Sequence, residues 1–269
     1  EALIARVTAQ TCRQSGLSVV YTELLDFDGA EIYIKPEPAL AGRSYREAIA
    51  AYVESAVIVI MRGNGEVLVN PPMDTRLAAD DSIIAISEDD DTVVQGKETP
   101  ASPEMSALVD RPPRQSNPER TLVLGWNAKA EAIVRELDNY VALGSEMVVV
   151  AQREGVRERL VALSKSLKRQ RLRHAPGDIA SRAVLDALQV YRYDHIILLS
   201  YSDLPIQQAD AQTLITLLHL RNIAEQHNVD LNIVSEMMDI RNRTLAQVAK
   251  ADDFIVSDKL VSLMISQLS

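Results

Sequence analysis

Residues 121–137 read TLVLGWNAKAEAIVREL, an apolar strand followed by a turn at Gly125 and an amphipathic helix. This order opens a dinucleotide-type domain, which binds pyrophosphate through the pattern G-x-G-x-x-G. Asn127 and Ala130 stand at the second and third glycine positions, where the backbone would have to approach the phosphates. Gln152 follows the next predicted strand, where an acid would hold the ribose. The stretch therefore predicts a Rossmann-like module used for sensing, with no bound nucleotide.

Strand patterns and helical patterns alternate from residue 119 to the end of the chain. Because parallel neighbours need a crossover connection, this βαβαβαβαβαβ order predicts an α/β fold with a doubly wound parallel sheet. The strands are expected at residues 122–124, 147–150, 170–173, 196–199, 231–234 and 254–256.

A smaller α+β unit is predicted ahead of this lobe. Ser44 followed by Glu47 is a capping-box pattern, which indicates a helix over residues 44–52. Residues 95–118 contain five prolines among polar residues, which is typical of a stiff linker. Further helices are expected at residues 2–12 and 19–27, and strands at residues 31–35, 56–62, 66–69 and 82–87.

Composition narrows the classes of partner. The chain has 269 residues and a net charge of −10, and the absence of a basic cluster makes nucleic acid an unexpected partner. Cys12 is the single cysteine, so we expect no disulfide and a reducing compartment. Apolar runs fall far short of the ~20 residues that cross a bilayer, so no direct membrane insertion is expected. The chain begins at Glu1 without a signal peptide, and we expect a fragment of a longer protein.

Acidic residues after two of the predicted strands suggest a metal site. Asp210 follows the fourth strand, and Glu236 and Asp239 follow the fifth. The carboxyl ends of parallel strands share one edge of a sheet, and Ca²⁺ takes six to eight oxygen ligands. Two simpler readings stay open: Asp210 as the cap of a helix over residues 211–226, and Asp239 as a solvated turn residue or the partner of a nearby arginine.

A second acidic run competes for the same role. Glu88, Asp89, Asp90 and Asp91 follow a predicted strand, where their mutual repulsion requires water, cations or basic partners. A solvated strand exit is the simpler reading. The four histidines have no zinc-ligand spacing, and no G-x-S-x-G motif is present. We therefore expect no catalytic residues and no enzyme activity.

Several segments in register carry a resemblance to a known family. The chain resembles the cytosolic RCK gating-ring region of the CASTOR/POLLUX family of ion channels, over nearly its whole length. The segments are LLDFDG at 24–29, ISEDDDT at 86–92, LVLGW at 122–126, LGSE at 143–146 and IVSDKLVSLM at 255–264.

This resemblance implies a division of the chain and a function. Residues 1–15 are the last helix of a truncated first RCK lobe, 16–94 its α+β C-terminal subdomain, 95–118 the linker, and 119–269 a second, Rossmann-like RCK lobe. The fragment is expected to be a ligand-sensing domain on the cytoplasmic side of a potassium-conducting, calcium-regulated cation channel. Its expected partners are its own pore domain and further copies, as a homotetramer or an RCK dimer.

The resemblance also bears on the calcium site. In calcium-gated RCK domains, one acid opens the helix after the fourth strand and an acid pair follows the fifth. Asp210 and Glu236 fall on the first two positions, whereas Met238 takes the third, so Asp239 would have to substitute. Two alternatives for the function remain: an NAD-binding regulatory subunit of a Trk-type potassium transporter, and a nicotinamide-dependent oxidoreductase.

Overall fold

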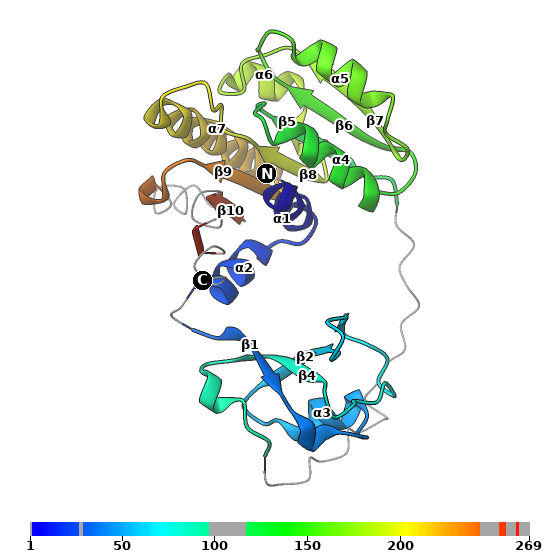
Figure 1. Cartoon of the computed structure of the whole chain (residues 1–269). Coiled ribbons are helices and arrows are strands. Elements are labelled where there is room, and N and C mark those ends of the chain that lie inside the picture. The colour runs from blue at the N-terminus through cyan, green and yellow to red at the C-terminus, as the bar shows by residue number, and fades with distance from the viewer. Residues whose placement is uncertain (1, 27–28, 97–116, 243–252, 257–261, 264–269) are drawn as a thin grey trace. The chain divides into compact units, whose positions relative to one another are not determined.

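The computed structural model describes residues 2–26, 29–96, 117–242, 253–256 and 262–263 (Figure 1). The chain divides into two compact units, one made of residues 1–21 and 114–269 and the other of residues 22–113. We call the first the C-terminal lobe and the second the small unit. Most of the predicted linker, residues 97–116, lies outside the described residues.

The C-terminal lobe contains a six-stranded sheet in which every pairing is parallel. Its strand order is β10-β9-β8-β5-β6-β7, so the connections run in opposite directions on the two sides of the β5–β8 pair. The predicted doubly wound Rossmann-like sheet is confirmed. The strands are β5 (Arg120–Leu124), β6 (Ser145–Val150), β7 (Gln170–Ala175), β8 (His195–Leu198), β9 (Ile233–Met237) and β10 (Asp253–Val256).

Helices cover both faces of this sheet, as a doubly wound fold requires. The helix α4 buries Ile133, Val134 and Leu137, one apolar stripe at helical spacing. The strands β5 and β8 are almost fully buried, which explains their continuous apolar sequence. The helical segments are α4 (Ala130–Tyr140), α5 (Val156–Ser164), α6 (Arg182–Ala187), α7 (Ile206–His227), and the 3-10 turns η4 (Val190–Arg192) and η5 (Ile240–Asn242).

The N-terminal helix α1 (Ala2–Arg13) belongs to the same compact unit. It packs beside α4 and over β8, β9 and β10 (Figure 1). Ile4, Val7 and Thr11 are among its buried residues. The resemblance assigns this helix to a preceding lobe, and that assignment remains a prediction. In the structure, its apolar side completes the covering of the C-terminal lobe.

The small unit is an antiparallel sheet of order β1-β4-β2-β3 with one helix on its inner face. The capping box predicted at Ser44 and Glu47 is present, with Ser44 N–H donating to Glu47 Oε2 at 2.7 Å. Tyr45, Ile60 and Ile83 are central to its core. The elements are α2 (Leu17–Leu25), which begins in the other unit, β1 (Glu31–Pro36), η1 (Pro38–Leu40), α3 (Tyr45–Ala51), β2 (Ala56–Met61), β3 (Val67–Val69), β4 (Ser82–Ser87) and η2 (Asp90–Thr92).

The outer face of this small sheet is also apolar. Cross-strand register places Ile34 beside Ile84, and Val69 on the same face. Ile34 is 59% exposed and Val69 70% exposed, on the two edge strands. An antiparallel sheet with a solvated face normally carries polar residues there. The outer face is therefore a candidate contact surface.

Among the helices that the structure describes, none combines the length and the apolar character needed for a membrane crossing.

Candidate functional site

The ligand crevice of an open parallel sheet lies at the carboxyl ends of the two strands where the connections diverge. Here those strands are β5 and β8. Gly125 ends β5 with φ of 98°, and a Cβ atom on it would lie 2.2 Å from the carbonyl oxygen of Leu199. The turn after β5 thus needs glycine because it presses directly on the chain leaving β8.

The carboxylate of Glu236 lies at this crevice, close to the start of α4. Glu236, at the end of β9, is 5% exposed and accepts a hydrogen bond of 2.7 Å from Asn127 Nδ2. Its other oxygen forms an ion pair with the Lys129 ammonium group. Lys129 is the residue that precedes the first turn of α4. Helix N-termini attract anions, and the Glu236 carboxylate lies against the residue that precedes α4.

Asn127 ties this carboxylate to the turn. Its Nδ2 group also donates to the carbonyl oxygen of Ser200 at 2.9 Å, and its Oδ1 accepts from Lys129 N–H at 3.0 Å. The side chain standing at the second glycine position therefore links β8, β9 and the start of α4. The sequence pattern indicated only that a glycine was lost here, and it gave no signal for Lys129.

Beneath this network lies a cavity of about 10 Å³. Its lining includes Thr8 from α1, Lys129 and Ile133 from α4, and Glu236. That volume is about the size needed for one water molecule. The donors that could bind an anion at this crevice, Asn127 Nδ2 and the Lys129 ammonium group, contact the Glu236 carboxylate.

Asp210 does not open a helix as predicted. The helix α7 begins at Ile206 with Pro205 as its cap, so Asp210 lies within its second turn and the N-cap reading is wrong as well. Its side chain is almost completely buried and accepts hydrogen bonds from the N–H groups of Met238 at 2.9 Å and Asp239 at 3.0 Å.

The same carboxylate also accepts a hydrogen bond of 2.7 Å from Asn242 Nδ2. Three donors from the segment after β9 thus converge on one buried side chain. Asp210 therefore fastens that segment to α7. The role follows from tertiary contact and has no signature in the local sequence.

Asp239 has the arginine partner that was left open as an alternative. Arg241 Nη2 lies 2.6 Å from Asp239 Oδ2, and the Arg241 N–H donates to Oδ1 at 2.9 Å. Hydrogen bonds from the Arg241 side chain, and then from its backbone, hold the pKa of Asp239 below its usual value. The pair is local and solvent-facing, which is the environment in which ion pairs contribute little to stability.

We call the carboxyl-terminal edge of the main sheet the rim, and its three candidate acids have separate partners. Glu236 pairs with Lys129 and Asn127, and Asp239 pairs with Arg241. Asp210 accepts hydrogen bonds from the segment after β9. Within the part of the chain that the structure describes, the acids whose oxygens gather closely enough for one metal ion are Asp89, Asp90 and Asp91, with ligand atoms within 4.8 Å.

These three residues, with Glu88, are exposed at the exit of β4. Asp89 caps the short 3-10 turn η2, and its Oδ1 accepts a hydrogen bond of 2.7 Å from Asp90 N–H. The turn holds the neighbouring carboxylates on one side of the chain. The donor set is all oxygen, which is the chemistry that Ca²⁺ prefers.

The expectation that the chain has no basic cluster is wrong for one segment. Residues 153–173 contain eight arginines and lysines but two acids, and all eight except Arg153 are exposed. Except for Arg153, which precedes α5, they lie on and between α5 and β7, beside a groove whose lining includes Arg157, Arg173 and His174. The strand β7 is at the sheet edge, and charged side chains there prevent pairing with strands of other molecules.

With the geometry known, comparison with other proteins is informative. Residues 1–103 match the family model described as Castor and Pollux, part of voltage-gated ion channel. Over 99% of its length the chain is 27% identical to the probable ion channel POLLUX of Oryza sativa subsp. japonica and 26% identical to the ion channel POLLUX of Lotus japonicus. The resemblance to the CASTOR/POLLUX family is thereby confirmed.

The chain spans 31% and 33% of the length of those two proteins. They are named as ion channels, which agrees with the expectation of a non-enzymatic role. Among solved structures, the human SLO3 gating ring is similar to this chain, with a TM-score of 0.63 at 15% sequence identity. The alignment covers 92% of this chain and 52% of the SLO3 chain. At that identity, the likeness shows that the chain has the fold of a gating ring.

Proposed function

We propose that this chain is part of a ligand-sensing gating ring on the cytoplasmic side of a cation channel. The observation that carries the proposal is the gating-ring fold over both units of a CASTOR/POLLUX relative. The crevice supports it, because the Glu236 carboxylate already pairs with Asn127 and Lys129 there. The same feature argues against the alternatives, an NAD-binding transporter subunit or an oxidoreductase.

The mechanism that we propose is thermodynamic linkage. A ligand that binds one arrangement of the ring better than another shifts the equilibrium toward that arrangement by the difference in binding free energy. Couplings of ~1–3 kcal/mol are typical for one site, and a ring adds the contributions of its copies. The conducted ion that we propose is potassium, on the family resemblance alone.

The ligand that we propose is Ca²⁺, and the acidic turn Asp89–Asp91 fits it better than the rim does. At the rim, a cation would have to displace the Lys129 ammonium from Glu236 and backbone N–H groups from Asp210. At the turn, three exposed carboxylates already converge, and their repulsion falls when a divalent cation binds.

Calorimetric titration with CaCl₂ tests this assignment. Replacing Asp89, Asp90 and Asp91 together by Asn is expected to weaken Ca²⁺ binding at least about tenfold, because three formal charges are removed from the ligand set. The control is Asp203→Asn, another exposed acid, which should leave binding unchanged. Absence of heat at millimolar Ca²⁺ for the unmodified chain would refute calcium, whereas loss of binding only in Glu236→Gln would place the site at the rim.

We propose that the chain assembles with further copies, as a homotetramer or an RCK dimer, and with its own pore domain. The apolar outer face of the small sheet supports a contact of this kind, since Ile34 and Val69 expose β-branched side chains on one surface. Contiguous exposed apolar patches mark interaction sites more often than isolated residues do.

The double substitution Ile34→Asp with Val69→Asp is expected to shift the chain toward monomer, because self-association would then bury unpaired carboxylates. Sedimentation velocity over a concentration series measures the shift. Leu143→Asp, a single exposed apolar residue in the other unit, is the control. Equal oligomer fractions in the double variant and the control would argue against this face as the contact.

A further inference from the structure

A groove of about 560 Å³ lies between the helix α5 and the edge strand β7 of the C-terminal lobe. Its α5 side is made of Arg157, Leu160, Val161 and Ser164. These four residues follow the spacing i, i+3, i+4 and i+7, so they share one face of the helix. Its β7 side is made of Leu172, Arg173, His174 and Pro176. The volume falls within the range of roughly 300–1,000 Å³ that is typical of small-molecule sites.

The groove combines apolar surface with charged side chains. Leu160 is 3% exposed and Leu172 is half-buried, so they form an apolar floor. Arg157 is exposed in the first turn of α5, and the side chain of Arg173 is 62% exposed. Apolar surface next to a few polar groups is the usual composition of a ligand pocket.

The charge of this region is opposite to that of the rest of the chain. Residues 153–173 contain eight basic and two acidic residues, whereas the remainder of the chain contains 20 basic and 36 acidic residues. A cleft lined by charges of one sign raises the local concentration of ions of the other sign. The ligand attracted to this groove is therefore an anion.

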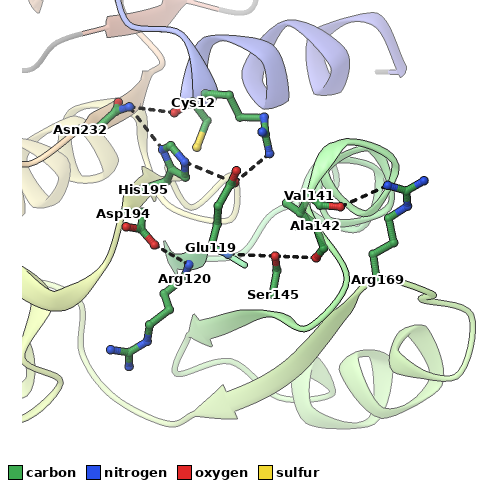
Figure 2. Close-up of polar contacts among 11 residues, drawn as sticks. Cys12, Glu119, Arg120, Val141, Ala142, Ser145, Arg169, Asp194, His195 and Asn232 are labelled. Carbon is green, nitrogen blue, oxygen red and sulfur yellow. Dashed lines mark hydrogen bonds and ion pairs between the residues drawn. The ribbon is translucent and has the colours of Figure 1, made fainter. Parts of the chain in front are cut away.

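The cations of the segment differ in their availability to a ligand. Arg153 lies 2.9 Å from a carboxylate oxygen of Asp203. Arg169 Nη1 donates to the carbonyl oxygen of Val141 at 3.4 Å (Figure 2). The side chain of Arg157, by contrast, forms no ion pair with another residue that the structure describes. Arg157 is thus the most available cation of the groove.

Arg173 and His174 are held in place by neighbouring groups. Arg173 Nη2 lies 2.7 Å from Glu146 Oε2, a contact that uses one of the several N–H donors of the guanidinium group. His174 Nε2 donates to the carbonyl oxygen of Ala151 at 3.1 Å, because a carbonyl can only accept. Arg173 therefore keeps donors for a ligand, and the ring of His174 is fixed at the groove.

Protection of the sheet edge explains only part of this pattern. Charged side chains on β7, such as Arg171 and Arg173, discourage pairing with strands of other molecules. That purpose requires neither cations on α5 nor charges of a single sign, since acids protect an edge as well. Arg157 and Arg159 are nevertheless exposed on α5. The surplus of cations on both sides of the groove needs another reason.

We propose that this groove binds a phosphate-bearing small molecule between Arg157 and Arg173. A phosphate group carries three acceptor oxygens, so it can accept from two guanidinium groups at once, whereas one bidentate arginine satisfies a carboxylate. The apolar floor contacts the carbon part of the ligand. Soluble phosphate compounds and phospholipid headgroups share this chemistry. The binding requires neither the calcium site nor the assembly proposed above, so its test is independent of theirs.

Calorimetric titration of the whole chain with inositol hexakisphosphate, at about 0.15 M salt, tests the site. We expect binding, and we expect Arg157→Gln with Arg173→Gln to weaken it at least about tenfold, because two charge-assisted contacts are lost. The matched control is Arg159→Gln with Lys168→Gln, which removes the same charge from exposed residues outside the groove lining. It should change the affinity less than about threefold.

A second anion tests the preference for phosphate. Benzenehexacarboxylate carries a carboxylate at every ring carbon, where inositol hexakisphosphate carries a phosphate. It should bind at least about tenfold more weakly, because a carboxylate has fewer oxygens to share between the two arginines. Equal affinity for the two anions would overturn the assignment to phosphate.

Flotation with phosphatidylcholine vesicles, with and without phosphatidylinositol bisphosphate, separates the two sources of phosphate. Binding that requires the phosphorylated lipid and is lost in the groove variant would assign the site to a headgroup. Binding of the soluble compound alone would assign it to a soluble ligand. Equal weakening in the two double variants would show a diffuse attraction to the basic segment and overturn the proposal. Absence of binding in both the titration and the flotation would overturn it as well.

Discussion

Replacing Gly125 by alanine is expected to destabilise the C-terminal lobe by about 3 to 5 kcal/mol, because two costs combine. At φ of 98° an L-residue is strained, and the added Cβ would lie 2.2 Å from the carbonyl oxygen of Leu199. That oxygen belongs to the backbone of the chain leaving β8, so no side chain can rotate away. The turn and β8 would have to separate.

Urea unfolding followed by the fluorescence of Trp126 measures this effect. Trp126 is the single tryptophan, is 7% exposed and adjoins Gly125, so its signal reports on the lobe alone. Gly155→Ala is the matched control: Gly155 also has a positive φ of 74°, but its Cβ would meet nothing within 4 Å. The control should cost about 1 kcal/mol, the strain without the clash. Similar losses in the two variants would show that the close approach to Leu199 does not hold the turn.

Replacing Asp210 by alanine is expected to cost a further large amount, about 3 to 5 kcal/mol, for a different reason. The buried carboxylate receives the N–H groups of Met238 and Asp239 and the side-chain amide of Asn242. Removing it leaves three donors without their acceptor, around a side chain that is 1% exposed. The loss is larger than that of one hydrogen bond, because unpaired buried polar groups carry the full cost of desolvation.

The matched control is Asp203→Ala in the same lobe. Asp203 is 59% exposed and pairs with Arg153 at 2.9 Å, so its removal should cost less than about 1 kcal/mol. Trp126 fluorescence in urea again gives the free energy of unfolding. Hydrogen exchange at residues 238 and 239 should rise in Asp210→Ala only. A mild effect on both measurements would mean that other contacts hold the segment after β9.

These two predictions describe one property of the rim. Gly125 brings the turn onto β8, and Asp210 holds the segment after β9 onto α7. Between them, Glu236 joins Lys129 at the start of α4. The rim that binds a cofactor in other proteins of this fold is here held together by its own side chains.

Local patterns were sufficient for the strands of the main sheet, although they placed the start of α7 several residues too late. Alternation of apolar runs with helical stripes predicted all six strands of the main sheet within a few residues, because period and burial are properties of short segments. The capping box at Ser44 was equally local, since its two members are three residues apart. The missing glycine at Asn127 was also a local signal, and the expectation that no nucleotide binds there stays a prediction.

The candidate site was less accessible to sequence reasoning. Asp210 and Glu236 were selected because strand ends share an edge, and the structure does bury both there. Their partners, however, come from segments 28 and 109 residues away in the sequence. No pattern within a window of the sequence shows that Lys129 neutralises Glu236. The expected common metal site at the rim depended on a convergence that these partners replace.

The amino-acid sequence by itself determined the class of fold, the succession of strands and helices along the chain and the absence of the usual phosphate-binding glycines, because each depends on neighbours along the chain. Only the tertiary structure decided that the rim acids bind N–H groups and a lysine, and that α1 is anchored through Asn232 and His195. The physical reason is that the partner of a buried charge or carbonyl is chosen by proximity in space, and packing creates that proximity between residues far apart in the chain.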